Sequence, residues 1–304
     1  YEDDSIWVSN FSSSTGDEYI TGRGMWIERD WSQWMPKSFL TYDLDDLAAG
    51  LRDTSVSLGA SRIWRPPDFH GDYNPQGRPT GAWLDPEHGV GYDLVLNRRL
   101  AGDIQMRLNY AYYKIKDFIA SNSAYDDYDP RGGNPVTPGL EYLDYKINLD
   151  EVVRQGVELQ ISGHLTDNLY FLLGYAWQDF ENQGNEPAGE TELDDRAQNF
   201  VTAKLTYQLS SATSLTLDYE YQDDQVAKTS EEIAPDVYSF DEIPIESYDV
   251  VGLSLKHKLF QEWRGLRNCV FEIFVRNLFN EDYQNASGYP ATDLTVGTGI
   301  RFQL

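Results

Sequence analysis

The chain contains very few of the residues that disulfide or metal chemistry requires: one cysteine, Cys269, and four histidines among 304 residues. A single thiol cannot form an internal disulfide bond or a cysteine cluster for a metal. Basic residues are also scarce, since 24 Lys and Arg stand against 50 Asp and Glu and give a formal net charge of −26. Binding to a phosphate backbone needs a basic surface, so nucleic acid is excluded as the expected partner.

Long hydrophobic runs are absent as well. No stretch of the sequence approaches the roughly 18 consecutive apolar residues that a transmembrane helix needs. This does not exclude a membrane protein, because a membrane β-strand carries apolar side chains only at alternate positions. The first residues, Tyr1–Asp4, have neither the basic nor the apolar region of a secretory signal peptide. The sequence is therefore expected to be that of a mature or truncated chain.

Aromatic residues, in contrast, are abundant, at 14% of the chain with 21 Tyr and 8 Trp. Such a content is typical of membrane barrels, which carry aromatic girdles at both interfaces. In residues 157–165 every odd position is apolar or small and the even positions are polar, and the same alternation recurs in residues 104–112, 169–177, 201–209 and 214–221. Successive side chains of a strand point to opposite faces, so each segment is predicted to be a strand with one apolar and one polar face.

The links between these segments alternate between short and long. Short links are predicted at 49–53, 100–103, 165–168, 209–213 and 260–267, and long polar links at 65–88, 120–141, 180–197, 225–246 and 280–293. Outer-membrane barrels have short periplasmic turns and longer extracellular loops. The pattern predicts an all-β transmembrane antiparallel up-and-down β-barrel, with about twelve strands if residues 5–12 form the first. A soluble β-sandwich or soluble barrel would also alternate, but usually without the short and long links in turn.

The last segment resembles the C-terminal signal that the outer-membrane assembly machinery recognises. Its pattern of a glycine, a hydrophobic residue and an aromatic residue is carried by Gly297, Ile300 and Phe302. Such proteins commonly stop at the aromatic residue, whereas here Gln303 and Leu304 follow it. The segment is predicted to be the final strand, ending on the periplasmic side.

Several motifs, in family order, resemble those of TonB-dependent receptors. They are Trp64-Arg65-Pro66-Pro67, Leu84-Asp85-Pro86-Glu87 with Gly91-Tyr92, Tyr112–Ile119, Gln155-Gly156-Val157-Glu158 and Val275-Arg276-Asn277-Leu278-Phe279-Asn280. The resemblance implies a barrel of about 22 strands around a globular plug. Residues 1–304 are then expected to be a C-terminal barrel portion, without the plug and the first strands, whose edge strands need partners.

The resemblance also implies a function: TonB-dependent active import of a scarce nutrient, such as an iron-siderophore chelate or cobalamin, across the outer membrane of a Gram-negative bacterium. The implied partners are outer-membrane lipid and lipopolysaccharide, the assembly machinery, the small-molecule chelate, and TonB through the plug. No enzyme activity and no cofactor are expected. Two alternatives stay open. One is a passive porin-like channel, and the other is an outer-membrane lipid hydrolase, for which Ser162 and His164 share a strand face but have no orienting group in the sequence.

The predicted ligand-binding residues lie in or beside the long loops. They are Arg65, His70, Tyr73, Trp83, Tyr125 and Tyr128. His70 follows the Arg-Pro-Pro motif, where the resemblance implies an axial ligand in haem-uptake members, although the sequence shows no second ligand. The acidic cluster Asp126, Asp127 and Asp129 could hold loosely bound Ca²⁺ through carboxylate oxygens, or could simply be a solvated surface. The many acidic loop residues would repel a highly anionic chelate.

Overall fold

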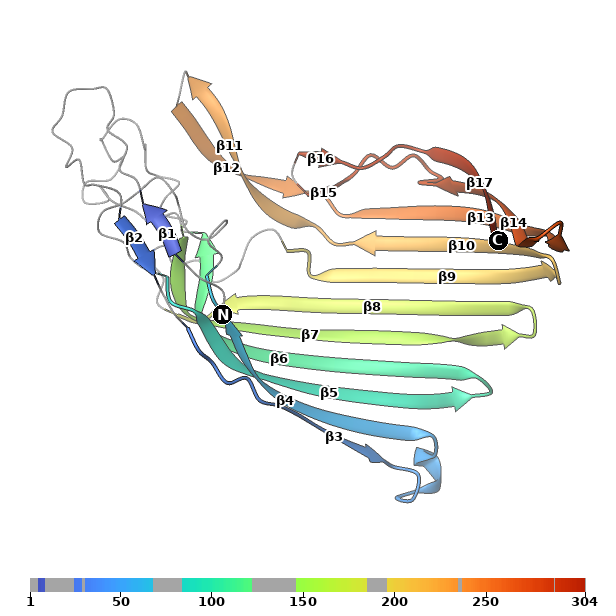
Figure 1. Cartoon of the computed structure of the whole chain (residues 1–304), viewed down its shortest axis with the longest axis horizontal. Helices are drawn as coiled ribbons and strands as arrows, with labels where there is room; N and C mark the ends of the chain where they lie inside the picture. Colours follow the sequence, from blue (N-terminus) through green and yellow to red (C-terminus); the bar gives the residue numbers. More distant parts are fainter. Residues whose placement is uncertain are drawn as a thin grey trace.

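The computed structural model describes residues 5–8, 25–28, 31–67, 84–121, 146–184, 196–234, 237–286 and 288–303. Eleven strands form one antiparallel sheet in which each strand pairs with the next one along the chain (Figure 1). They are β3 (Lys37–Asp43), β4 (Thr54–Arg65), β5 (Glu87–Ala101), β6 (Ile104–Ser121), β7 (Lys146–Thr166), β8 (Leu169–Asn182), β9 (Asn199–Ser210), β10 (Thr213–Gln222), β13 (Tyr248–Trp263), β14 (Leu266–Arg276) and β17 (Thr295–Gln303). The predicted all-β, up-and-down architecture is confirmed.

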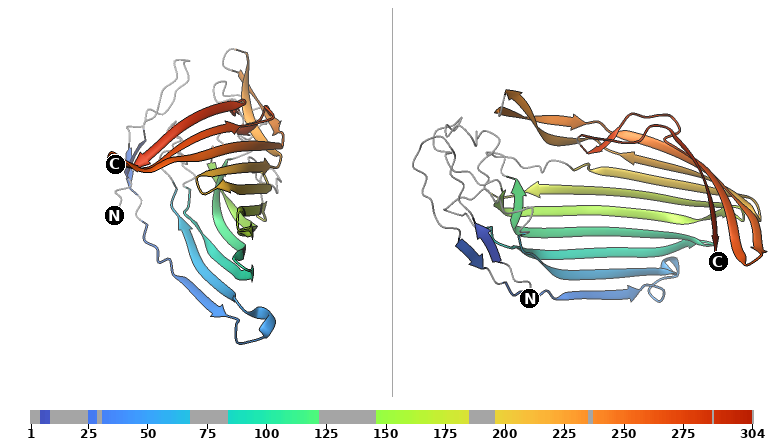
Figure 2. Two further views of the ribbon diagram at one scale, coloured as in Figure 1. Left: turned by 90° about the vertical axis from the view of Figure 1, so that its right-hand side faces the viewer. Right: turned by 45° about the horizontal axis from the view of Figure 1, so that its top comes forward.

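The sheet is a single curved layer with edges at β3 and β17 (Figure 2). No second sheet covers either of its faces within the residues that the structure describes, which excludes the alternative of a β-sandwich. Within the same residues, no helix is long and apolar enough to cross a membrane. A short 3-10 helix, η1 (Ala49–Leu51), lies in the link between β3 and β4.

Three small hairpins lie outside the large sheet. They are β1 (Ser5–Val8) with β2 (Met25–Glu28), β11 (Gln225–Ala234) with β12 (Val237–Ile245), and β15 (Gln284–Ala286) with β16 (Tyr289–Pro290). The prediction that residues 5–12 form the first barrel strand was wrong, because β1 pairs with β2 instead. Residues 9–12 of the predicted strand lie outside the described residues.

The short and long links lie at opposite ends of the sheet. The tight turns after β5, β7, β9 and β13 gather at one end together with the β3–β4 link and the end of β17, and the long links leave from the other end (Figure 1). The turn between β5 and β6 uses Gly102 at a φ of +59°, a conformation that glycine adopts without steric cost. We call these the short-turn end and the loop end of the sheet, and they match the predicted alternation.

One face of the sheet is apolar from edge to edge. Residues that pair directly across strands point to the same face, and the registers join two apolar rows. One row, across β3 to β8, is Leu40, Leu58, Leu94, Tyr110, Val157 and Trp177. The other, across β8 to β17, is Phe171, Leu205, Leu217, Leu253, Val275 and Val296. Leu94 and Leu217 are 42% and 41% exposed, far more than buried core residues. Exposed apolar surface of this extent indicates contact with lipid.

The opposite face is polar. It carries the ion pairs Lys204–Asp218 at 2.9 Å and Lys256–Glu272 at 3.4 Å, and a hydrogen bond of 3.1 Å between the hydroxyls of Thr206 and Thr216. Charged side chains of this kind need water or an ionic partner. The polar face is therefore the wall of an aqueous lumen, and the two faces give the strands the alternation that the sequence predicts.

A charge on the apolar face is expected to destabilise the protein in a bilayer. Leu217→Arg, in the middle of β10, should lower the free energy of unfolding by about 2–4 kcal/mol, because the guanidinium would lie in hydrocarbon. Thr216→Arg is the matched control, since the neighbouring side chain points to the polar face. Urea unfolding in phospholipid vesicles measures both variants, and equal losses would contradict the assignment of the faces.

Candidate functional site

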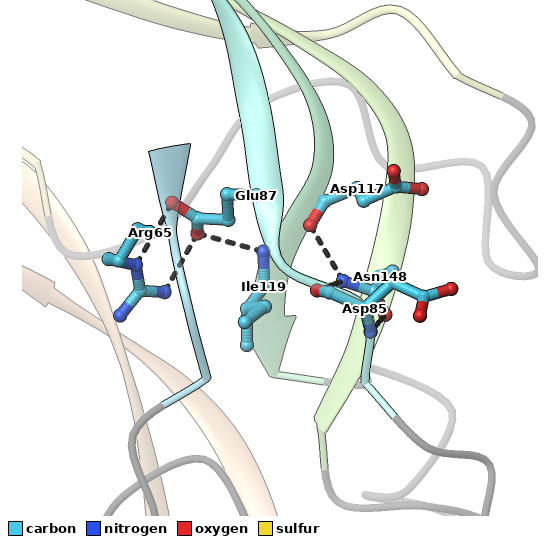
Figure 3. Close-up of polar contacts among 6 residues, drawn as sticks. All are labelled: Arg65, Asp85, Glu87, Asp117, Ile119 and Asn148. Atoms are coloured by element: carbon cyan, nitrogen blue, oxygen red, sulfur yellow. Dashed lines mark hydrogen bonds and ion pairs between the residues drawn. The ribbon is translucent and has the colours of Figure 1, made fainter. Parts of the chain in front are cut away.

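Two motifs meet at the loop end of β4 and β5, where the long links leave the sheet. The guanidinium of Arg65, the last residue of β4, donates from Nε and Nη2 to the two carboxylate oxygens of Glu87, at 2.9 and 2.7 Å (Figure 3). Glu87 opens β5, and its side chain is only 7% exposed. It also accepts a hydrogen bond of 3.0 Å from the backbone N–H of Ile119 on β6. One buried carboxylate therefore joins three strands at the point where they leave the sheet.

Asn148 of β7 makes a second junction beside the first. Its amide nitrogen donates to the backbone carbonyls of Asp85 and Asp117 at 2.8 and 2.6 Å, and its side-chain oxygen accepts from the N–H of Asp85 at 2.7 Å (Figure 3). Asp117 has a φ of +53°, which exposes its carbonyl to this side-chain donor instead of a regular strand ladder. The segment that enters β5 is thus attached to β6 and β7.

Apolar side chains on both faces of the sheet are almost completely buried near these polar junctions, unlike most side chains of the open sheet. They are Leu84, Ile115, Ile119, Leu149, Val152 and Val153. Gly89 allows the close packing, because a Cβ at this position would lie 2.1 Å from the carbonyl oxygen of Lys114. The loop end of β5 to β7 is therefore a rigid base for the long links.

A similar arrangement closes the loop after β14. Asn277 has a φ of +50° and a buried side chain. Its amide donates to the carbonyls of Glu281 and Thr292 at 2.7 and 3.2 Å and accepts from the N–H of Glu281 at 2.8 Å. The ring of Tyr283 packs on that of Tyr248 with centroids 4.2 Å apart, and burial raises the pKa of Tyr283. The Asn-Leu-Phe-Asn motif is therefore a loop-closing element.

The base of the link after β10 is held by polar contacts between strands. The hydroxyl of Tyr175 on β8 donates to the side chain of Asn199 on β9 at 2.8 Å, and Asn199 donates to Asp223 at 2.6 Å. The hydrogen bond from Asn199 lowers the pKa of Asp223. Asp223 therefore stays ionised over the physiological range and keeps this contact.

The polar face carries a cluster of aromatic and cationic side chains near the loop end. Register places Gly91, Tyr113, Arg154 and Phe180 side by side across β5 to β8. The Arg154 guanidinium lies 5.9 Å from the ring centroid of Tyr113 and 5.0 Å from that of Phe180, and Arg196 lies 4.2 Å from Phe180. These are cation–π distances. We call Tyr113, Arg154, Phe180 and Arg196 the lumen cluster.

A hollow in the polar face adjoins the lumen cluster. It is lined by Tyr113, Arg154, Asn109, Glu158 and Phe200, among others. The side-chain oxygen of Asn109 is buried and has no hydrogen-bond partner in the described part of the chain. A buried acceptor of this kind is costly unless a donor reaches it. The hollow therefore offers the guanidinium of Arg154, the carboxylate of Glu158, aromatic rings and an unused acceptor to a ligand in the lumen.

His164 at the short-turn end has an orienting carboxylate that the sequence did not indicate. Asp103 contacts Nδ1 of His164 and accepts from its backbone N–H at 3.0 Å, and the contact with His164 lowers the pKa of Asp103. Ser162 and His164 lie on the polar face of β7, and no hydrogen bond joins their side chains. The pair therefore does not form the lipid-facing nucleophile that a hydrolase would need.

The model of the TonB-dependent receptor-like β-barrel family matches residues 6–278 of the sequence. The chain belongs to this family. Proteins of the family lie in the outer membrane of Gram-negative bacteria, which agrees with the apolar face of the sheet. No curated protein sequence matches the chain significantly.

Solved structures of receptors share the fold at low sequence identity. The ferric-catecholate import receptor Fiu from E. coli K12 has a TM-score of 0.58 at 16% identity, over 98% of this chain and 39% of Fiu. The pyoverdine receptor FpvA from Pseudomonas aeruginosa has a TM-score of 0.65 at 15% identity, over 93% of this chain and 37% of FpvA. The siderophore receptor PiuA from Acinetobacter baumannii has a TM-score of 0.61 at 12% identity, over 93% of this chain and 37% of PiuA. The chain therefore spans less than two fifths of each of these three receptors.

Most of the predicted site residues lie outside the residues that the structure describes. These are His70, Tyr73, Trp83, Tyr125 and Tyr128 for the ligand, and Asp126, Asp127 and Asp129 for Ca²⁺. Their roles stay predictions. The described residues contain no group of three or more His, Cys, Asp or Glu that could hold a metal ion.

The other predicted residues are described. Arg65 is bound to Glu87 at the loop end, and its role toward a ligand stays a prediction. Gly297, Ile300 and Phe302 lie in β17, where the ring of Phe274 covers Gly297 and Ile300 pairs with Phe271. Gly297 of the predicted assembly signal thus leaves room for the ring of Phe274 on the neighbouring strand. Recognition of this segment by the assembly machinery stays a prediction.

Sequence reasoning missed the lumen cluster. Tyr113 and Phe180 occupy positions of the polar face, where the alternation predicts polar residues. Two aromatic residues that interrupt the polar rows of neighbouring strands, with an arginine between them, were the available signal.

Removing the Glu87 side chain should loosen the loop end of β5 and β6. In Glu87→Ala the guanidinium of Arg65 and the N–H of Ile119 lose their acceptor, so the free energy of unfolding should fall by about 1–3 kcal/mol. Hydrogen exchange at the Ile119 amide should become faster than in the wild type. Glu181→Ala, an exposed carboxylate near the loop end of β8, is the control and should change little. Unchanged exchange at Ile119 would contradict a structural role for Glu87.

Two substitutions separate the contributions of Asn277. Asn277→Gly keeps a residue suited to positive φ but removes the hydrogen bonds, and should cost about 1–3 kcal/mol. Asn277→Ala loses the same bonds and adds backbone strain of about 1–2 kcal/mol. Urea unfolding midpoints should therefore fall in the order wild type, Gly, Ala. A glycine variant as stable as the wild type would show that the side-chain bonds contribute nothing.

Proposed function

We propose that this protein imports a ferric siderophore across the outer membrane, with energy supplied through TonB. Family membership supports active import, and the similar solved structures are siderophore receptors, which favours an iron chelate over cobalamin. The polar face of the sheet supplies a wall along which a hydrophilic ligand could pass. The edges at β3 and β17 would pair with further strands of a closed barrel, because hydrocarbon leaves no other partner for their backbone groups.

The observation that carries the proposal is the lumen cluster. The chain as a whole is strongly acidic, yet Arg154 and Arg196 lie together around one aromatic ring on the polar face. A siderophore chelate with acidic oxygens and flat aromatic or amide groups suits this arrangement, because guanidinium groups bind oxyanions and rings stack on planar groups. The unused acceptor of Asn109 would take a hydrogen bond from a ligand amide or hydroxyl.

The protein itself is inferred to catalyse no reaction, since import driven through TonB requires only binding and release by the barrel and plug. A passive channel is the less favoured function, because the chain belongs to a receptor family. Loosely bound Ca²⁺ at Asp126, Asp127 and Asp129 is retained as a proposal.

Uptake of ⁵⁵Fe chelates by a deletion strain tests the function. Cells that carry the wild-type gene should accumulate iron from at least one siderophore, and a protonophore should abolish this uptake. Arg154→Gln/Arg196→Gln should raise the apparent Kd about tenfold, through lost charge and cation–π contacts, at unchanged receptor abundance. Lys204→Gln, which removes a charge elsewhere on the polar face, is the control. Uptake that persists with the protonophore would indicate a passive channel. An equal change of the apparent Kd in Arg154→Gln/Arg196→Gln and in Lys204→Gln would show that the lumen cluster is not the ligand-binding site.

A further inference from the structure

On the short-turn side of the lumen cluster, the polar face carries two hydrogen-bond acceptors side by side. Register pairs Asn109 of β6 with Glu158 of β7, and the row continues to Ala176 of β8 and Phe200 of β9. Directly paired residues have Cβ atoms roughly 4.5–5.5 Å apart, so one small group can reach both side chains. The side-chain oxygen of Asn109 is buried without a partner among the described residues, and Glu158 is exposed. We call Asn109 and Glu158 the acceptor pair.

The acceptor pair lies where two hollows of the polar face meet. The hollow beside the lumen cluster has a volume of about 230 Å³, and a second one, toward the short-turn end, has about 440 Å³. Asn109 and Glu158 line both of them. The second volume falls within the range of roughly 300–1,000 Å³ that is typical of ligand sites. Ala111 and Gly156 lie between the lumen cluster and the acceptor pair, and neither has a side chain that could separate them. A ligand held by the lumen cluster can therefore reach the acceptor pair.

The charges around the acceptor pair do not neutralise one another. On β7, Arg154 lies four residues before Glu158, or roughly 14 Å at about 3.4 Å per residue. Arg107 of β6 lies on the other side and lines the second hollow. Within the described ranges none of these charged side chains forms an ion pair, whereas the lysines of β9 and β13 on the same face are paired with carboxylates. The charges on β6 and β7 thus alternate along the wall as positive, negative and positive.

An ammonium group suits the acceptor pair better than a neutral donor does. Amide and carboxylate oxygens accept hydrogen bonds, and an ammonium has three donors to offer them. A hydroxyl or an amide N–H of a ligand would displace water from Glu158 and leave its charge without compensation, which is costly. Arg107 makes the following row positive. The place for a cationic group is therefore confined to the acceptor pair.

Given the proposed import of a ferric siderophore, on which this inference rests, we propose that the chelate is of mixed charge and carries a free amine besides its acidic oxygens. The amine, protonated at neutral pH, binds between Asn109 and Glu158. The acidic oxygens face the guanidinium of Arg154. A purely anionic chelate would bring like charge next to Glu158, which lowers its affinity. The acceptor pair is thus a specificity determinant, and the lumen cluster holds the other end of the ligand.

Two ferric chelates that differ in one charge test the proposal on the purified complete receptor. One is a linear ferric trihydroxamate with a free terminal amine, and the other is the same chelate with that amine acetylated. Quenching of tryptophan fluorescence gives the Kd of each. The wild type should bind the amine form about tenfold or more tightly than the acetylated form, because acetylation removes a charge-assisted contact. Glu158→Gln should bind both forms about equally, because its amide still accepts a hydrogen bond but has no charge.

Glu272→Gln is the matched control, because it makes the same chemical change on the polar face of β14, where Glu272 pairs with Lys256. It should keep the preference of the wild type for the amine form. Thermal unfolding identifies a variant that has lost its fold. If Glu158→Gln has, Asn109→Ala, which is expected to reduce the preference several-fold, decides.

Equal binding of the two trihydroxamates by the wild type would overturn the proposal. So would a preference that Glu158→Gln retains, or one that Glu272→Gln loses as well. A receptor that binds a strongly anionic ferric tricatecholate and neither trihydroxamate would also overturn it, although the import of a siderophore would then stand. A receptor that binds none of these chelates would contradict the proposed function too.

Discussion

Backbone hydrogen bonding in hydrocarbon is the constraint on which this structure depends. A strand in a bilayer has no water to satisfy its N–H and C=O groups, so each one must pair with a neighbouring strand. In the described part of the chain every strand of the eleven-stranded sheet has a paired neighbour on both sides, except β3 and β17 at its edges. Because the ladder satisfies the backbone hydrogen bonds, the polarity of each side chain can match the medium that its face of the sheet contacts. Apolar residues therefore occupy the face toward lipid, and polar residues predominate on the face toward the lumen, with Tyr113 and Phe180 as exceptions. The alternation in the sequence is the result.

Where the strands leave the hydrocarbon, the ladder no longer holds the chain, and side chains take over this role. Glu87, Asn148 and Asn277 each bind backbone groups of other segments at the loop end. Their hydrogen bonds fix the bases of the long links, which carry most of the predicted ligand residues.

Much of the large sheet could be predicted from the sequence, because alternation and link length are local properties. The segments around 104–112, 157–165 and 201–209 lie in β6, β7 and β9, as predicted. The β11–β12 hairpin was not predicted, because its residues were assigned to a long polar link. The first strand was misplaced, because residues 5–8 alternate but pair with residues 25–28. Alternation indicates a strand, yet it does not indicate which partner the strand has.

The site was harder to predict, because its contacts join distant residues. Arg65 and Glu87 are 22 residues apart, and Asn148 binds Asp85 across 63 residues. The motifs that contain them were visible, but the sequence alone could not show that these motifs bind one another.

Spin labels along β10 test the central claim most directly. With Cys269→Ala as background, single cysteines at positions 214 to 219 would be labelled in the receptor reconstituted in bilayers. The accessibility of each label to oxygen, which enters lipid, is compared with that to a water-soluble nickel chelate. The account predicts a period of two, with high oxygen accessibility at 215, 217 and 219 and high chelate accessibility at 214, 216 and 218. Uniform accessibility along the strand would contradict it.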